Sequence, residues 1–259
     1  MNKTLCCVGS GGCWLIGLAL LSAPFASLAG AFAVSPVRLE FGTTARSGAI
    51  TVRNDDQVPL SFQVQAMHWS QDAAGKEHYS DASGELIYFP RLLTVAPGKE
   101  AVIRVGVRQP VVTTEKTFRL FIEELPGAVA AAAPGSAPQV RFLMRFGAPV
   151  HVLPPRPLDR LELQEATVAD GAARWRLHNA GNQHARVESL ALRGLDAQGS
   201  EVFVHRPEDR YLLSGQVRAF AVPLPQHDCM RLARLEIALV TERSELRELT
   251  ETGPQPACS

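Results

Sequence analysis

Short runs in which apolar and polar residues alternate follow one another along almost the whole chain of 259 residues. In "SPVRLEF", for example, Val37, Leu39 and Phe41 alternate with more polar residues. A period of two places successive side chains on opposite faces of a half-buried β-strand. Turn signals recur every ~8–12 residues, as in antiparallel sandwiches, and no long stretch keeps a capped helical period. The sequence therefore predicts an all-β protein, with Trp69 and Trp175 in its core.

The expected strands form two series separated by a proline-dense segment. An alanine-rich loop, "GAVAAAAPGSAP", precedes the last strand of the first series, and "LPPRPL" at 153–158 has the composition of a stiff interdomain joint. We therefore predict two immunoglobulin-like β-sandwich domains, at 34–152 and 159–259. The strands are expected at 35–41, 49–54, 60–69, 85–95, 101–107, 117–125 and 140–152, and then at 160–168, 173–179, 185–194, 200–205, 217–224 and 230–240.

Residues 1–33 have the order of parts found in a secretory signal peptide. Lys3 precedes an apolar stretch, and "AGAFA" then offers small residues at the spacing of a signal-peptidase site. Cleavage after Ala31 or Ala33 fits, and Ala33 is preferred. A permanent membrane anchor is the alternative, which Pro24 and the small-residue end disfavour. We expect export to the periplasm and no stable membrane insertion after cleavage.

Export decides how the five cysteines are interpreted. Three of them lie in the signal peptide, which leaves Cys229 and Cys258. Two cysteines in an oxidising compartment most simply form one disulfide. A reactive pair is the alternative, but the CxxC spacing is lacking. We therefore expect Cys229–Cys258 to be a structural bridge.

The charge balance and the motifs argue against several classes of function. Without Lys3, the 26 Lys and Arg become 25 against 26 Asp and Glu, which is not the basic excess of a nucleic-acid binder. No GxSxG, Walker, HExxH or dinucleotide-binding motif is present. The seven histidines are scattered, and both remaining cysteines lie in the second domain, far from Met67–His68 and Met144–His151. We expect no enzymatic activity, no cofactor and no metal.

Several segments, taken in order, resemble the periplasmic chaperones of chaperone–usher pilus assembly, the PapD-like family. They are "VSPVRLEF", "ITVRNDDQVPLSFQVQAMHW", "FPRLLTVAPGKEAVIRVGV", "TEKTFRLFIEELP" and "VRFLMRFGAPVHV", within residues 34–154. The second half agrees loosely, through "WRLHNAGNQHARVESLAL". The resemblance implies two immunoglobulin-like domains in a boomerang arrangement. The form "RFGAPVHV" is more similar to the archaic branch, which assembles pili of spore-coat-U-like subunits.

The resemblance also implies a function. Chaperones of this family bind pilin subunits, which are sandwiches that lack their last strand, and lend an edge strand to the open groove. They protect the subunits from aggregation and deliver them to an outer-membrane usher. Pilin (fimbrial) subunits and an usher are therefore the expected partners. The alternatives are an exported two-domain immunoglobulin-like structural or adhesive protein, and a periplasmic enzyme or metal carrier.

In this family, two basic residues of the cleft bind the C-terminal carboxylate of the subunit. Arg38 matches the first, and Arg145, in "LMRFGAP", is the best match to the second, with Arg141 as the fallback. The family more often has Lys at the second position, and the spacing to Pro149 is one residue shorter here. An Arg is suitable because its planar guanidinium can donate two hydrogen bonds to a carboxylate. The alternative for each is a solvated arginine on the polar face of a strand.

The resemblance places the donor strand at the end of the first domain. Val140, Phe142 and Met144 share one face of the expected strand and are the candidates to fill the groove of a subunit. The alternative is that they belong to the core of the first sandwich. Leu143 lies on the other face with the arginines, and one bulge would exchange the two sets.

Overall fold

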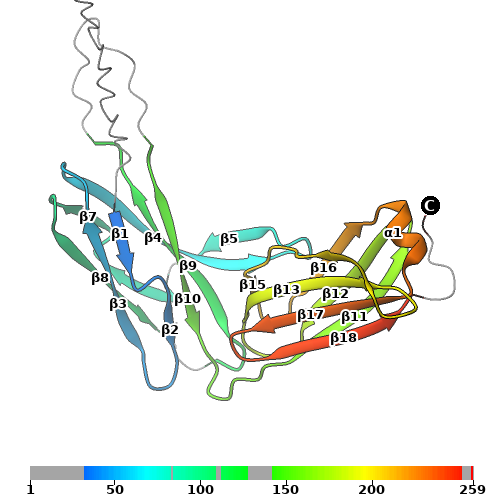
Figure 1. Cartoon of the computed structure of the whole chain (residues 1–259). Helices are drawn as coiled ribbons and strands as arrows, with labels where there is room; N and C mark the ends of the chain where they lie inside the picture. The colour runs from blue at the N-terminus through cyan, green and yellow to red at the C-terminus, as the bar shows by residue number, and fades with distance from the viewer. Residues whose placement is uncertain (1–31, 83, 109–111, 128–141, 253–257, 259) are drawn as a thin grey trace, which may run out of the picture.

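The computed structural model describes residues 32–82, 84–108, 112–127, 142–252 and 258. Their strands form two β-sandwiches that meet at an angle (Figure 1). The prediction of an all-β chain with two sandwiches is confirmed. Among the described residues, no helix has the length and apolar character needed to cross a membrane.

The N-terminal sandwich is built from the first ten strands. These are β1 (Phe32–Ser35), β2 (Leu39–Phe41), β3 (Ser47–Asn54), β4 (Leu60–Gln71), β5 (Glu77–Asp81), β6 (Leu86–Phe89), β7 (Leu92–Val95), β8 (Glu100–Val107), β9 (Lys116–Glu124) and β10 (Arg145–Val152). One sheet has the order β1–β3–β8–β6, and the other has the order β2–β10–β9–β4–β5, with β7 beside β4. The core lies between them: in β8, Ile103 and Val105 are buried, whereas Arg104 between them is exposed.

The strand β4 changes the face that it buries. Its even-numbered residues from Leu60 to Ala66 point into the core, but farther along the strand Trp69 and Gln71 are the buried residues. The Trp69 ring lies edge-on to Tyr211 of the second domain, with ring centres 5.3 Å apart. The prediction that Trp69 is buried is therefore confirmed, but the second domain covers its ring, and Trp69 does not join the cluster between the two sheets.

The strand β10 has one paired edge and one partly open edge. It pairs with β9 from Arg145 to Val152, and in parallel with β2 from Val150 to Val152. Between Arg145 and Pro149, no other strand of the described residues pairs with its outer edge. Its second half is buried on both faces: Val150 belongs to the core, and His151 points the other way and is fully buried there.

The strand β10 begins later than predicted. Phe142 and Met144 lie outside it and are 67% and 47% exposed, so neither belongs to the core. The last residue of β9, Glu124, donates its N–H to the carbonyl of Met144, and Pro126, which has no N–H, follows soon after. The pairing therefore stops at this point. Val140, the third candidate for the donor strand, lies outside the described residues.

The C-terminal sandwich contains the remaining elements. They are β11 (Leu161–Ala169), β12 (Ala172–Asn179), β13 (Ala185–Leu195), β14 (Glu201–His205), β15 (Tyr211–Leu212), β16 (Val217–Pro223), α1 (Gln226–Arg231), β17 (Arg234–Thr241) and β18 (Glu245–Glu251). The sheets have the orders β11–β12–β16 and β14–β13–β17–β18, with β15 beside β13. Trp175 is buried in the core between them and stacks on Phe220, which confirms its predicted place.

Prolines and a short helix account for the main errors in the predicted strands. Pro36 divides the run 35–41 between two sheets, and Pro90 divides 85–95 into β6 and β7. The run 230–240 begins as the end of α1, so β17 starts at Arg234. The prediction did not include β5, β15 and β18; β5 is exposed at every residue, so it has no alternation to detect.

The predicted joint at 153–158 lies between β10 and β11, and Asn182 holds it in place. The Asn182 side chain accepts a hydrogen bond from the N–H of Leu158 at 2.7 Å and donates to the carbonyls of Arg156 and Thr113. One side chain of the second domain therefore binds both the joint and a loop of the first domain, which limits the freedom of the joint.

The structure joins Cys229, in α1, to Cys258 by a disulfide. Cys229 is fully buried in the second core, and the bridge connects the C-terminal segment to it. A loop of 29 residues is closed in this way. In the chain-entropy model a loop of that length stabilises the folded state by about 3–4 kcal/mol.

Replacing both cysteines, Cys229→Ser with Cys258→Ser, is expected to lower the free energy of unfolding by about 2–4 kcal/mol, because the unfolded chain regains the freedom of the loop. Urea titration of the periplasmic protein measures this. Dithiothreitol should shift the wild-type midpoint to the same extent and leave that of the double variant unchanged; an effect of dithiothreitol on the double variant would contradict the assignment.

Candidate functional site

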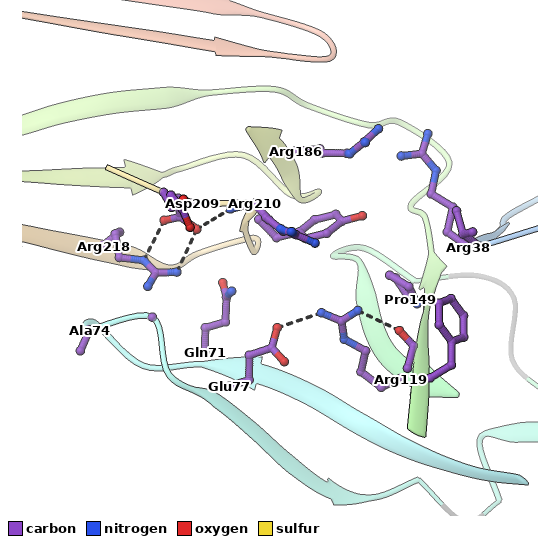
Figure 2. A pocket seen from close by; sticks show the side chains of 16 residues that line it. Arg38, Gln71, Ala74, Glu77, Arg119, Pro149, Arg186, Asp209, Arg210 and Arg218 are labelled. Carbon is purple, nitrogen blue, oxygen red and sulfur yellow. Dashed lines mark hydrogen bonds and ion pairs between the residues drawn. The ribbon is translucent and has the colours of Figure 1, made fainter. Parts of the chain in front are cut away.

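A cleft of about 730 Å³ lies between the two domains (Figure 2). Five arginines and three carboxylates line it, so its charge is net positive at neutral pH. Gln71, Gly147, Pro149 and Tyr211 contribute uncharged surface. The charged residues are Arg38, Glu77, Arg119, Arg186, Glu208, Asp209, Arg210 and Arg218.

The tip of the β4–β5 hairpin closes one side of the cleft against the second domain. The N–H of Ala219 donates to the carbonyl of Ala73 at 2.9 Å. Gly75, with φ +85°, lies against the guanidinium of Arg218, and a Cβ at this position would be 0.8 Å from Nη1. The same guanidinium is paired with Asp209, with 3.2 Å between Nε and Oδ2. Gly75 is therefore required both for the turn and for this contact between the domains.

Arg38, the first predicted anchor residue, lies in the cleft just before β2. Its Nη1 donates to both carboxylate oxygens of Glu242, at 3.0 and 3.3 Å, and Arg186 donates to the same carboxylate. Burial raises the pKa of Glu242, but the hydrogen bonds from Arg38 and Arg186 outweigh it and hold the pKa below its ordinary value. The Arg38 side chain is 33% exposed. It therefore binds a carboxylate of its own chain and still faces solvent.

Arg119, on β9, is a second cation of the cleft and was not among the predicted site residues. Its Nη2 donates to Glu77 at 2.8 Å, its Nη1 donates to the carbonyl of Gly147 at 3.2 Å, and its guanidinium lies 3.8 Å from the centre of the Trp69 ring. The side chain is 14% exposed. Among the described residues, its buried Nε has no hydrogen-bond partner. Arg119 is therefore held rigidly, with one donor unused.

Arg145, the second predicted anchor residue, is not among the residues that line the cleft. Its guanidinium lies 3.7 Å from the centre of the Phe121 ring, and its Nε is 3.3 Å from Glu123. In the register of β9 and β10, Arg145 is opposite Glu123, and Arg119 is opposite Pro149, four residues nearer the cleft. The structure therefore does not bring Arg145 next to Arg38 in the cleft. Arg141, the fallback, lies outside the described residues.

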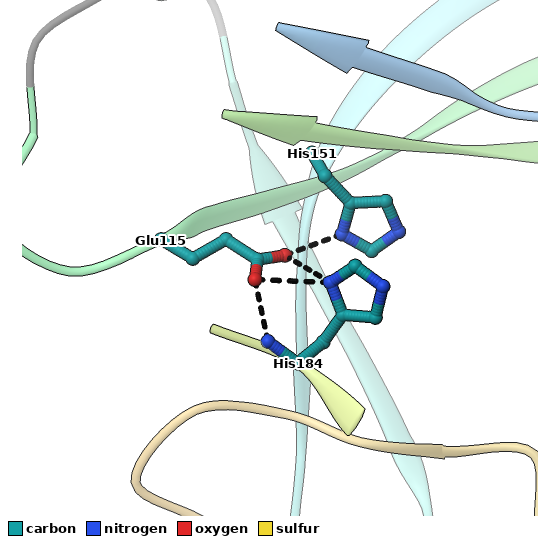
Figure 3. Close-up of side chains that lie close together, drawn as sticks. All are labelled: Glu115, His151 and His184. Carbon is teal, nitrogen blue, oxygen red and sulfur yellow. Dashed lines mark hydrogen bonds and ion pairs between the residues drawn. The ribbon is translucent and has the colours of Figure 1, made fainter. Parts of the chain in front are cut away.

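Glu115, His151 and His184 form a buried cluster at the junction of the domains (Figure 3). Glu115 precedes β9, His151 is in β10, and His184 precedes β13 of the second domain. The two rings stack with their centres 3.9 Å apart, and the Nδ1 atoms of His151 and His184 lie 2.5 and 2.9 Å from Glu115 Oε1. The N–H of His184 donates to Oε2 at 2.5 Å.

The cluster keeps its carboxylate ionised. Burial raises the pKa of Glu115, but the hydrogen bonds from His151 and His184 outweigh it and lower the pKa to about 2. Burial lowers the pKa of His151, because a charged ring loses its hydration there. Glu115 is therefore negatively charged at pH 7, and burial makes His151 harder to protonate.

The sequence carries little signal for this cluster or for Arg119. His151 and His184 come from different domains, at a spacing that matches no metal-binding motif. Arg119 alternates with apolar residues, as a solvated strand residue does. What places these side chains at a site is the second domain, which covers the outer face of the β10–β9–β4 sheet.

Gly75→Ala is expected to destabilise the protein more than Gly98→Ala does. Both glycines have positive φ, so each substitution costs about 1–2 kcal/mol of backbone strain. Nothing lies within 4 Å of a Cβ at Gly98, whereas at Gly75 the Cβ displaces Arg218 from Asp209, which adds about 1–3 kcal/mol. Urea unfolding of both variants checks this difference, and equal losses would exclude a contribution from the contact between the domains.

Comparison with known proteins agrees with this architecture. Residues 31–157 match the family model described as "Pili and flagellar-assembly chaperone, PapD N-terminal domain". The family is one of assembly chaperones and not of enzymes. A comparison with curated proteins found no significant match.

Solved structures match over both domains. The class 5 fimbriae chaperone CfaA is 14% identical, with a TM-score of 0.56, over 85% of this chain and 99% of that chain. A chain of the CsuC–CsuE chaperone–tip adhesion subunit complex of archaic Csu pili from Acinetobacter baumannii is 20% identical, with a TM-score of 0.55, over 86% and 98%. A chain of the SafA pilin–SafB chaperone complex of Salmonella enterica is 12% identical, with a TM-score of 0.57, over 87% and 99%.

These identities show the fold, which is two immunoglobulin-like sandwiches, and the family model adds the type of the first domain. Residues 31–157 therefore match the model of the PapD N-terminal domain of pili and flagellar-assembly chaperones, and the whole chain has the two-sandwich fold found in solved fimbrial chaperones.

Proposed function

We propose that the chain is a periplasmic chaperone that binds pilin subunits by lending them β10, protects them from aggregation and delivers them to an outer-membrane usher. The observation that carries the proposal is the open edge of β10 from Arg145 to Pro149, which leads directly into the arginine-lined cleft. An unpaired strand edge offers backbone N–H and C=O groups to an added strand. Solved complexes of chaperones with a pilin or a tip subunit share this fold.

The segment before β10 supplies apolar side chains for the added strand. Phe142, Leu143 and Met144 are exposed, although they are large and apolar. If β10 extended through them, Phe142 and Met144 would continue the face of Phe146, which packs against the core. We propose that these residues adopt strand conformation as an extension of β10 when a subunit binds, with Phe142 and Met144 entering its open groove. Val140 would extend the same face.

The cleft would bind the terminal carboxylate of the subunit. Arg38 already holds the carboxylate of Glu242 with Nη1, so its guanidinium is placed to bind an anion. We propose Arg119 as its partner, because it lines the same cleft and its side chain is partly exposed there. The competing candidate for this anchor is Arg145, which would contact the subunit farther along β10, outside the cleft.

Single alanine variants of the three arginines discriminate between these assignments. Charged hydrogen bonds of this kind contribute about 1.5–3 kcal/mol each, so Arg38→Ala and Arg119→Ala are expected to reduce subunit affinity by roughly 10–100-fold. Arg145→Ala should retain most of the affinity. The measurement is the amount of pilin that co-purifies from periplasm with the tagged protein, identified by mass spectrometry.

Arg119→Lys serves as the control, because it keeps the charge, and the thermal midpoint of each free variant reports any loss of folding. A loss of pilin with Arg145→Ala but not with Arg119→Ala would move the anchor to Arg145. If no β-sandwich subunit co-purifies with the wild type, the chaperone proposal fails and a structural or adhesive protein takes its place.

We further propose that signal cleavage occurs after Ala31, the earlier of the two sites. Phe32 begins β1, pairs with Asn54 and packs its ring 4.9 Å from that of Phe62. Cleavage after Ala33 would remove half of β1. N-terminal sequencing of the periplasmic protein should therefore begin at Phe32; a first residue of Val34 would favour the later site, and an unprocessed N-terminus would contradict export.

A further inference from the structure

We propose that Glu115, His151 and His184 form a binding site for a divalent transition metal of the Zn²⁺ class, and that the ion links the two domains. Glu115 and His151 belong to the first sandwich, and His184 belongs to the second (Figure 3). None of the three residues lies in the open edge of β10 (Arg145–Pro149) or lines the cleft. This proposal therefore does not depend on the chaperone function.

The donor set and its geometry fit such an ion. Two imidazoles and one carboxylate are ligands that zinc uses in proteins. One ligand atom from each residue lies within 4.8 Å of the others. Both Nδ1 atoms face the same oxygen of Glu115, at 2.5 and 2.9 Å, so their lone-pair directions meet near that oxygen. Zn–N bonds are about 2.0–2.1 Å. An ion would therefore occupy the neighbourhood of Oε1, and the carboxylate would shift back to bind it.

The Nε2 atoms of His151 and His184 are buried, and among the described residues neither has a hydrogen-bond partner. Binding through Nδ1 moves the ring proton to Nε2, so no proton is lost and no hydrogen bond at Nε2 is broken. The rings are therefore free to change tautomer when the ion arrives.

The cluster differs from an ordinary buried ion pair. The side chains bonded to Glu115 are two imidazoles, and none of its recorded partners is a Lys or Arg. Buried carboxylates are usually paired with a cation or coordinate a metal. The side chains of all three residues are 0% exposed, so water does not solvate the charge. A divalent ion would be bound by this carboxylate together with the two imidazoles.

The surroundings are suited to a closed structural site. Trp69 lies edge-on to His151, with ring centres 6.2 Å apart, and Tyr211 lies 6.0 and 5.7 Å from the rings of His151 and His184. Tyr211 also lines the cleft, so one aromatic ring separates the cluster from solvent there. An apolar shell of this kind excludes water and strengthens metal–ligand bonds.

The test uses the full-length exported protein, purified through a tag that contains no histidine. Elemental analysis should find one zinc per chain, or the protein stripped with EDTA should bind one equivalent of ZnCl₂ in a calorimetric titration. Zinc should raise the thermal midpoint of the stripped protein. Co²⁺ bound at the site should give the visible absorption of a low-symmetry complex with nitrogen and oxygen ligands.

Glu115→Gln and His184→Asn are the site variants, and His78→Asn is the matched control. His78 also bonds a carboxylate, Asp72, but on the exposed β4–β5 hairpin. Loss of a direct ligand should weaken zinc binding by more than about 100-fold, beyond the effect of losing an outer-sphere contact. The control variant should bind zinc as the wild type does.

Zinc binding that survives both site variants but is lost in His78→Asn would assign the ion to the surface and overturn the proposal. A wild-type protein that contains no metal and whose thermal midpoint is unchanged by zinc would also overturn it, and the cluster would then be held by shared protons alone. Because the wild-type measurements need no substitution, a site variant that fails to fold leaves the proposal testable.

Discussion

The burial of the outer face of the β10–β9–β4 sheet by the second domain is the constraint on which the other features depend. An ordinary sandwich has one core face and one solvated face per sheet. Here the end of the sheet is covered on both sides, so Trp69, Arg119 and His151 are enclosed although they point away from the core. Arg119 then lines the cleft, His151 belongs to the buried cluster beside it, and the Trp69 ring lies against both.

The alternation of apolar and polar residues was sufficient to predict the fold. It was not sufficient to predict that the second domain buries the outer face of this sheet. The pattern of β8, in which Ile103 and Val105 are buried and Arg104 is exposed, could be predicted because one face meets the core and the other meets water. The burial of Trp69 could be predicted in the same way, but its contact with Tyr211 of the second domain could not. The alternation in one sequence predicts that an apolar residue is buried. It does not predict on which of two buried faces of the sheet the residue lies.

The candidate site was predictable where a contiguous segment carried it. Arg38 was placed in the cleft by a short stretch that resembles one family motif, and the cysteines were paired by counting. Arg119 and the pair His151–His184 depend on the approach of two domains, which no local spacing encodes. The start of β10 was missed because it depends on where its neighbour ends, at Glu124, and not on its own alternation.

The parallel pairing of β10 with β2 covers three residue pairs, yet it fixes the position of the whole strand. Val150 is held in the core, and its neighbour His151 is held at the domain junction, so sliding β10 by one residue would exchange an apolar side chain with a polar one in two buried places at once. The open edge of β10 therefore presents its backbone N–H and C=O groups at fixed positions. A strand that pairs with this edge begins at the end that β2 fixes. Strands of different length would therefore differ at the opposite, exposed end of β10.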